Sequence, residues 1–373
     1  MTTQIPAEHT PNVHGIPVLE GPVAPRDGLI RIGTRGSKLA VTQTSGVARA
    51  IALATGAEVV LVIVKTFGDV TTAPLSQLGG TGVFVSALRE ALLRGDCDLA
   101  VHSLKDLPTA PCPGIVLGAV PQRADARDAL VSRGSVPLAD LPTGARVGTG
   151  SPRRVAQLLA RRPDLEICDL RGNVDTRMAR VENDLDAVVL AAAGLERIGR
   201  EDAIAERFSL DTAPAAPGQG ALAVEARAAD HAAGVEADPA GDATRTAASH
   251  SLVAEALTVL DDAHARACAL AERALLATLE AGCAAPVGAW GRIDGERLLL
   301  TGSVYSLDGQ RELSVTLDRE WAIGFAGLDE ADGTGDGIVV GGADERAREL
   351  GAAAARALLD DGARELAPLG DAR

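Results

Sequence analysis

Aromatic side chains are scarce in this sequence, which has two Trp, one Tyr and four Phe in 373 residues. Basic residues are also in deficit, since 36 Lys and Arg stand against 51 Asp and Glu and give a formal charge of −15. A nucleic-acid-binding surface needs a basic face, and a single-strand binder also needs aromatic rings on which bases stack. We therefore predict that the chain has no nucleic-acid partner.

Long apolar runs are missing too. No stretch approaches the ~20 residues that a membrane-spanning helix needs. The longest runs, Val59–Val64 and Ala187–Leu195, are typical of buried strands. The N-terminus has no basic region followed by an apolar core, so it does not match a secretory signal. We therefore predict a cytoplasmic protein without a membrane partner.

The five cysteines form no CxxC pair and leave an odd count, which argues against a disulfide framework. Cysteine and histidine show no metal-ligand spacing either, so we predict no metal site. Four of the cysteines are interpreted as small, inert hydrophobic residues. These four are Cys97, Cys112, Cys168 and Cys268. Cys283 differs, because it follows Gly282 in a turn before Pro286 that can expose the thiol.

The sequence does contain a repeated alternation of short apolar runs with helical patterns. Between residues 27 and 122 we predict strands at Leu29–Gly33, Glu58–Lys65, Leu99–His102 and Val116–Val120, with helices at Lys38–Thr55 and Val83–Leu93. After Arg127 we predict strands at Arg146–Thr149, Glu166–Leu170 and Ala187–Ala191, with helices at Pro152–Arg161 and Val174–Asn183. Two consecutive βαβ sets predict an α/β fold of two doubly wound lobes with a cleft between them.

The remaining segments complete the predicted domain organisation. Residues 1–26 are predicted to be a disordered extension, because they are rich in proline and lack periodicity. The first domain comprises residues 27–121 and 221–228, and the second comprises residues 122–220. Residues 229–263 are interpreted as an insertion or linker, and residues 264–373 as a smaller α+β domain.

Arginines gather at the carboxyl ends of the predicted strands, with eight of them against four acidic residues in the window 146–180. Arg153 and Arg154 follow Ser151 and Pro152 at the start of a predicted helix, where free N–H groups already favour an anion. Two guanidinium groups at the positive end of a helix indicate a multiply charged anionic ligand. The strings Thr34-Arg35-Gly36-Ser37 and Arg171-Gly172-Asn173 repeat the arrangement, and Arg177 lies on the helix that Asn173 caps. Arg161 and Arg162, late in their helix, are interpreted as ordinary surface residues.

A further loop adds possible chemistry, because Lys105 and Asp106 follow the buried strand that ends at His102. Nearby cations would keep Asp106 ionised, and a carboxylate in such a cleft can stabilise a transient cation. His102 is expected to pack in or near the core. Two other functions stay open from the residues alone. One is a two-lobed carboxylate-binding protein without catalysis, and the other is a cysteine hydrolase that pairs Cys283 with His264.

Eight strings in this sequence, taken together and in order, resemble the porphobilinogen deaminase (hydroxymethylbilane synthase) family. They are IRIGTRGSKLA, GGTGVF, DLAVHSLKDLPT, VGTGSPRRVAQL, LRGNVDTR, DAVVLAAAGLERIG, PGQGALAVEAR and LEAGCAAPVG, and they cover about 27–227 and 265–290. The resemblance implies two lobes similar in fold to two-lobed periplasmic anion-binding proteins, followed by a third domain. It also implies a monomeric transferase that condenses four porphobilinogen molecules head to tail with loss of ammonia, and then releases 1-hydroxymethylbilane by hydrolysis in heme (tetrapyrrole) biosynthesis.

The same resemblance assigns roles to individual residues. The third domain would carry a dipyrromethane cofactor covalently attached through Cys283, and Asp106 would be the catalytic carboxylate that assists loss of the amine and stabilises the cationic azafulvene. The residues expected to hold the cofactor are Ser103, Lys105, Thr149, Ser151, Arg153, Arg154 and Arg177. The residues expected to bind incoming or growing rings are Arg35, Ser37, Gln43, Arg171, Arg177 and Arg197. A lid over the cleft would span residues 67–82, where Gln77 and Thr81 stand at positions that many relatives fill with lysine.

Overall fold

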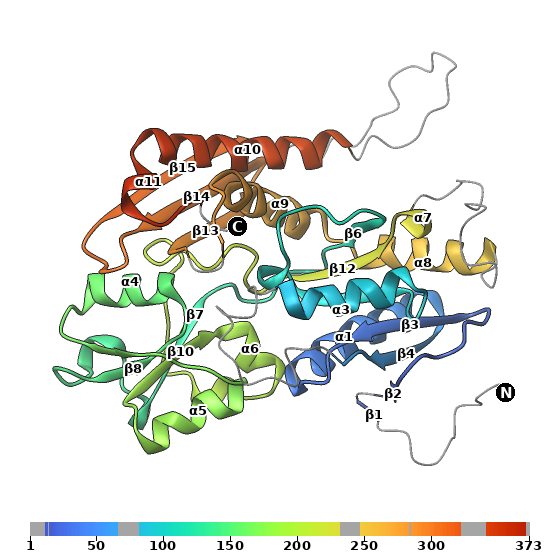
Figure 1. The fold of residues 1–373 in the computed structure, drawn as a ribbon, viewed down its shortest axis with the longest axis horizontal. Coiled ribbons are helices and arrows are strands. Elements are labelled where there is room, and N and C mark those ends of the chain that lie inside the picture. The colour runs from blue at the N-terminus through green and yellow to red at the C-terminus, as the bar shows by residue number, and fades with distance from the viewer. Residues whose placement is uncertain are drawn as a thin grey trace.

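The structure is a computed structural model that describes residues 12–13, 15–65, 82–231, 247–282, 285–321 and 341–370. These residues form two α/β lobes, each built on a mixed sheet, and a third domain with an antiparallel sheet (Figure 1). The seven-stranded sheet has the order β1 (Asn12–Val13), β2 (Ile16–Glu20), β4 (Glu58–Ile63), β3 (Leu29–Thr34), β5 (Leu99–Ser103), β12 (Leu222–Arg227), β6 (Ile115–Ala119). The five-stranded sheet has the order β11 (Glu206–Arg207), β7 (Asp128–Ser132), β10 (Ala187–Ala191), β8 (Arg146–Gly148), β9 (Glu166–Cys168).

Helices cover both faces of the first lobe's sheet. Side chains alternate along β5, so that Leu99 and Val101 face α1 (Lys38–Thr55) and α8 (Ala247–Leu260), whereas Ala100 faces α3 (Gly82–Leu93). The helix α1 begins where the Ser37 side chain accepts a hydrogen bond from Ala40 N, and ends at Gly56 in the left-handed conformation. Both faces of the sheet are therefore buried, as its almost wholly apolar strands require.

The second lobe repeats this layering. Leu130, Val147 and Val189 pack with α4 (Pro152–Arg161) on one face of the sheet. The opposite face packs against α5 (Val174–Asn183) and α6 (Ala192–Arg197). Asn173 caps α5, since its side chain accepts from Thr176 N at 2.8 Å, as the sequence predicted. The predicted fold class, two α/β lobes with a smaller α+β domain, is confirmed.

The third domain packs two helices on one face of a three-stranded antiparallel sheet (Figure 1). Its strands are β13 (Val287–Asp294), β14 (Arg297–Tyr305) and β15 (Glu312–Glu320), and its helices are α9 (Ala263–Thr278), α10 (Gly341–Asp360) and the short α11 (Ala363–Leu366). Short helical segments elsewhere are α7 (Ala228–His231) and single turns at Leu104–Asp106, Arg133–Ser135, Leu138–Asp140 and Glu201–Ala203. In the described part of the chain, no helix combines the length and the apolarity needed to span a membrane.

The prediction of a disordered extension over residues 1–26 is wrong for the part that the structure describes. Ile16–Glu20 forms β2, which pairs in parallel with β4, with Val18 opposite Leu61. Arg31 fixes the connecting segment, because its Nη1 donates to Val23 O at 2.8 Å. Ile16–Glu20 has apolar residues at alternate positions, and pairing with the edge of a buried sheet stabilises it as a strand. The proline-rich composition of the N-terminal segment does not indicate this pairing.

The interpretation of residues 229–263 as an insertion or linker is also wrong in part. The helix α8 packs against α1 and completes the core of the first lobe through Val253, Ala256, Leu257 and Leu260 (Figure 1). Gly118 in β6 makes room for it, since a Cβ there would lie 2.7 Å from a methyl group of Leu257. Nine of the 14 residues of α8 are apolar, and they include the exposed Val259 as well as the buried Val253, so the sequence pattern did not show which face is buried.

Several predicted features lie outside the described residues. These are most of the lid, including Gln77 and Thr81, and Cys283 itself. The other domain boundaries remain predictions, although β12 returns from the second lobe and inserts between β5 and β6.

Truncation of Leu257 tests whether α8 is part of the first lobe. Leu257 is 3% exposed, so Leu257→Ala should lower the free energy of unfolding by about 2–5 kcal/mol. Val259 on the same helix is 48% exposed, and Val259→Ala should change it by less than about 0.5 kcal/mol. Urea unfolding of both variants measures the difference, and equal effects would show that α8 is not docked.

Candidate active site

Two buried leucines shape the loop that follows β5. Leu104 and Leu107 are 1% and 5% exposed, and Leu107 N donates to Leu104 O across a single helical turn. Leu104 N also donates to Ala221 O, which fixes the start of the turn to the crossover segment that leads into β12. The anchored leucines leave Lys105 half-buried and Asp106 exposed between them. The loop therefore presents a cation and a carboxylate side by side.

Lys105 points its ammonium group toward the crossover. Lys105 Nζ donates to Gln219 Oε1 at 3.3 Å, and Gln219 is 1% exposed. Burial lowers the pKa of Lys105 to about 8, Asp106 and Asp128 oppose this shift, and Arg154 and Arg153 add to it. Lys105 is thus held in a buried site where positive charge is already in excess.

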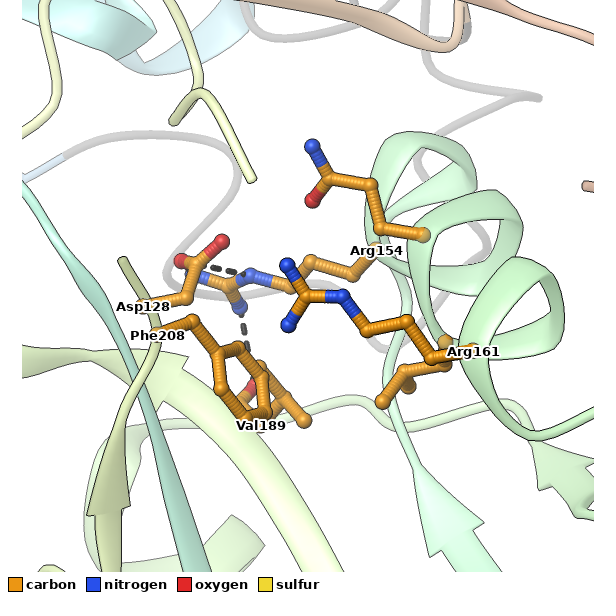
Figure 2. Close-up of a pocket in the computed structure, with 7 residues that line it drawn as sticks. Asp128, Arg154, Arg161, Val189 and Phe208 are labelled. Atoms are coloured by element: carbon orange, nitrogen blue, oxygen red, sulfur yellow. Dashed lines mark hydrogen bonds and ion pairs between the residues drawn. The ribbon is translucent and has the colours of Figure 1, made fainter. Parts of the chain in front are cut away.

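The arginines at the start of α4 converge on Asp128, at the start of β7. Arg153 Nη1 donates to Asp128 Oδ2 at 2.8 Å, and Arg154 Nη2 donates to Asp128 Oδ1 at 2.7 Å. Figure 2 shows Arg154 reaching Asp128 and also Val189, whose carbonyl accepts from Arg154 Nη1 at 2.9 Å. Burial opposes ionisation of Asp128, yet the two arginines outweigh it and hold the pKa of Asp128 well below its usual range. The sequence analysis did not identify Asp128, and it assigned both arginines to ligand binding alone.

These bonds leave donors at the α4 N-terminus unused. Arg153 Nε is buried and has no hydrogen-bond partner among the described residues. Ser151 stands at the predicted cap position, but its side chain makes no capping bond, and its N–H donates to Thr149 Oγ1 at 3.2 Å. A buried donor without a partner costs free energy that an acceptor on a ligand would recover. The α4 N-terminus therefore retains unused capacity for an anion.

Two further arginines add positive charge beside Arg154. Arg171 precedes α5, and Arg177 lies within it. Burial lowers the pKa of Arg177, and Arg154 and Arg171 lower it further, while Asp106 and Asp169 act in the opposite direction. Arg171 also pairs with Asp169 at 3.0 Å on the surface. We call the five interacting basic residues the cationic cluster: Lys105, Arg153, Arg154, Arg171 and Arg177. Three carboxylates accompany them, so the cluster keeps a net positive charge.

The other predicted site residues lie at the edges of the two lobes. Ser103 Oγ donates to Gln43 Oε1 at 3.3 Å, which joins the end of β5 to α1. Arg197 Nη2 donates to Gly220 O at 2.7 Å, and burial lowers the pKa of Arg197. Ser37 serves as the cap of α1, and Arg35 is half-buried at the end of β3.

The structure also locates three residues for which the sequence analysis predicted no binding role. His102 is 7% exposed and its Nε2 lies 3.1 Å from Glu225 Oε2, so the prediction of a core position is confirmed. Arg161 is not a solvated surface residue, because it lies over the ring of Phe208 (Figure 2) and donates to Thr212. Arg162 likewise donates to carbonyls such as Leu138 O as well as pairing with Asp164.

The cysteine hydrolase alternative does not fit the geometry. His264 lies in the first turn of α9, and Gly282 follows the opposite end of that helix. A helix of 16 residues is about 24 Å long. Cys97 and Cys268 are buried, and burial raises the pKa of each thiol to about 12, so neither is an activated nucleophile.

The strand β13, which begins four residues after Cys283, is bonded to the same crossover as Gln219, since Ala289 N donates to Ala215 O at 2.8 Å. Gln157 links the domains again, because its Nε2 donates to Tyr305 Oη at 3.0 Å while its Oε1 accepts from Arg153. The third domain thus adjoins the α4 end of the cationic cluster. Among the described residues, no group of three or more His, Cys, Asp and Glu side chains is arranged to hold a metal ion.

A two-lobed α/β protein with an exposed carboxylate inside a cluster of guanidinium and ammonium groups belongs to the class that holds ligands with several carboxylates. The family model "Porphobilinogen deaminase, dipyromethane cofactor binding domain" matches residues 30–234, and "Porphobilinogen deaminase, C-terminal domain" matches residues 266–360. The chain belongs to the porphobilinogen deaminase family. Membership brings porphobilinogen deaminase (hydroxymethylbilane synthase) activity in tetrapyrrole biosynthesis and a domain that binds a dipyrromethane cofactor.

Individual relatives match along nearly the whole chain. A porphobilinogen deaminase of Leifsonia xyli subsp. xyli is 53% identical over 354 residues, which covers 94% of this chain and 98% of that protein. One of Cutibacterium acnes is 46% identical and covers 91% of this chain and 97% of that protein. Among solved structures, the methionine binding protein MetQ is 12% identical, covers 62% of this chain and 90% of that chain, and has a TM-score of 0.38.

Chemical labelling of the lysines tests the charge of Lys105. Only an unprotonated amine is acetylated, so the labelling of Lys105 should rise with a midpoint near pH 8 in protein prepared without the cofactor. Mass spectrometry after brief treatment with acetic anhydride measures this, with the exposed Lys65 as internal reference. Because the positive charge disappears above that pH, binding of carboxylates at Lys105 should weaken there. A labelling midpoint above pH 10 would contradict the buried environment.

Proposed function

We propose that this chain joins four porphobilinogen molecules head to tail on a dipyrromethane primer, releasing ammonia at each step, and hydrolytically releases 1-hydroxymethylbilane. The observation that carries the proposal is the exposed carboxylate of Asp106 in electrostatic contact with Lys105 and Arg177. Asp128 is buried and holds two arginines in place, whereas Asp106 is exposed, and an exposed carboxylate would only repel the ligand of a pure anion binder. A reaction that passes through a cationic substrate has a use for such a carboxylate.

The cofactor would be held by the donors at the α4 N-terminus together with Lys105. Arg153 Nε lacks a partner among the described residues, and the Ser151 side chain makes no capping bond. Each pyrrole ring carries an acetate and a propionate, and each charge-assisted hydrogen bond to such a group contributes about 1.5–3 kcal/mol. Ser103, Thr149, Arg154 and Arg177 complete the proposed set. Covalent attachment is assigned to Cys283, which precedes by four residues the strand β13 that is bonded to the crossover.

The incoming and growing rings would bind at the edges of the lobes. The proposed residues are Arg35, Ser37, Gln43, Arg171, Arg177 and Arg197. Gln43 accepts a hydrogen bond from Ser103 at the end of β5. Arg177 interacts electrostatically with both Arg154 and Arg171. When bound, the cofactor supplies the terminal pyrrole ring to which the first substrate is joined.

Asp106 is assigned to the substrate's reacting end. As the aminomethyl group of porphobilinogen loses ammonia, positive charge develops on the substrate, and a fixed carboxylate stabilises that charge. The single turn between Leu104 and Leu107 holds Asp106 in place without covering it. We also expect the chain to act as a monomer in the cytoplasm.

Replacement of Asp106 separates this role from structure. Asp106→Asn removes the charge but keeps the size, and should lower turnover about 100-fold or more. Asp106→Glu keeps the charge and should retain more activity than the Asn variant. Pigment formation from porphobilinogen measures turnover, and near-normal turnover of Asp106→Asn would reject the assignment.

Intact mass tests the cofactor attachment. The purified protein should exceed the mass of the bare chain by one dipyrromethane, and Cys283→Ser should lack that excess. Cys112→Ser serves as the matched control and should keep it. An adduct that persists in Cys283→Ser would mean that another residue is the anchor.

A further inference from the structure

A second cavity lies at the junction of the first lobe with the third domain. Its volume is about 630 Å³, and its walls come from the segment 107–117 and from the helices α3, α9 and α10. None of the cationic cluster lines it. We call it the junction cavity.

Most charged side chains of the junction cavity are already paired. Glu225 bonds to Arg89 at 2.7 Å, Glu349 to Arg319 at 2.5 Å, and Arg348 lies 3.8 Å from Glu345. Arg273 and Arg356 remain, and neither has a carboxylate within 4 Å among the described residues. Arg273 donates only to two backbone carbonyls, Leu107 O and Pro108 O. Two guanidinium groups of the lining, the half-buried Arg273 and the exposed Arg356, are thus left without an ion pair among the described residues.

Burial makes the positive charge of Arg273 costly. Burial lowers the pKa of Arg273 to about 10, and Arg89 adds to this shift while Glu225 opposes it. A buried guanidinium is stabilised by a carboxylate in a bidentate arrangement.

The rest of the lining is largely apolar. Leu107, Ile115, Leu117 and Leu270 contribute side chains, and alanines of α9 and α10 contribute small ones. Seven residues of the lining are charged, but five of them are paired, so apolar walls surround two unpaired cations. Apolar walls with a small number of groups free to bind are typical of sites for small organic ligands. A hydrated inorganic anion would leave these walls without a partner.

We propose that the junction cavity binds a small organic acid, with an apolar skeleton against the leucines and carboxylate groups on Arg273 and Arg356. Arg273 holds the two carbonyls that directly follow Asp106, at 2.9 Å and 2.6 Å. A bound carboxylate competes for its N–H groups and loosens the loop that carries Asp106. Occupancy therefore lowers turnover from a distance, a consequence that rests on the proposed function.

The binding test uses the cofactor-loaded protein and the fluorescent naphthalene sulfonate ANS as reporter. Naphthalene-2,6-dicarboxylate should displace ANS, whereas the same concentration of inorganic phosphate should not. Arg356→Gln should weaken dicarboxylate binding about tenfold or more. Arg346→Gln, on the same helix and outside the cavity lining, should leave it unchanged. Equal affinity in the wild type and Arg356→Gln, or displacement by phosphate, would overturn the proposal.

Cys112 reports the location of the ligand, because it lines the cavity and is partly exposed. The dicarboxylate should slow alkylation of Cys112 by N-ethylmaleimide and leave Cys168, which is outside the lining, unaffected. Unchanged alkylation of Cys112 at saturation would place the ligand elsewhere and overturn the proposal.

Turnover supplies the last readout. Saturating dicarboxylate should lower kcat and leave KM for porphobilinogen unchanged, and an unchanged kcat would overturn the coupling to Asp106. Fluorescence and alkylation need no substrate. A protein that binds the dicarboxylate but forms no pigment would therefore contradict the proposed function and not the junction cavity.

Discussion

Glu272 is a fully buried carboxylate that the three parts of the structure share. It lies on α9 in the third domain, is 0% exposed, and accepts from Arg123 Nη1 at 2.6 Å and Nη2 at 3.0 Å. It also accepts from Gly218 N at 2.6 Å and Gly291 N at 2.7 Å. A buried charge is tolerated only when its partners satisfy it completely, and these four bonds do so. Burial alone would lower the pKa of Arg123, but Glu272 outweighs burial and raises it.

Two of the partners of Glu272 stand on the connections between the lobes. Arg123 belongs to the first connection and Gly218 to the second, so one carboxylate fixes both at the point where the chain crosses. The next residue, Gln219, continues the arrangement into the active site. Its Nε2 donates to Ala126 O and Asp128 Oδ1, while its Oε1 accepts from Lys105 and Arg154. The third domain thereby positions Lys105, Arg153 and Arg154 of the cationic cluster through a continuous set of hydrogen bonds.

Much of the fold was predictable, because its signals are local. The caps Ser37 and Asn173, the glycine after α1 and the apolar runs of β3, β4 and β10 each act within a few residues. The errors fell on segments whose stability comes from a distant neighbour. β2 depends on the edge of β4, and α8 depends on a groove over Gly118, more than a hundred residues earlier.

The sequence by itself determined most helices and strands of both lobes, the membership of the family and the residue types gathered at the strand ends. Only the tertiary structure decided how those residues are paired. Arg153 and Arg154 had the composition of an anion site, but Asp128, about 25 positions away, accepts several of their hydrogen bonds and leaves Arg153 Nε without a partner among the described residues. The reason is physical: a buried charge is stabilised by whichever opposite charge the fold brings within 3 Å, and that distance is independent of separation along the chain.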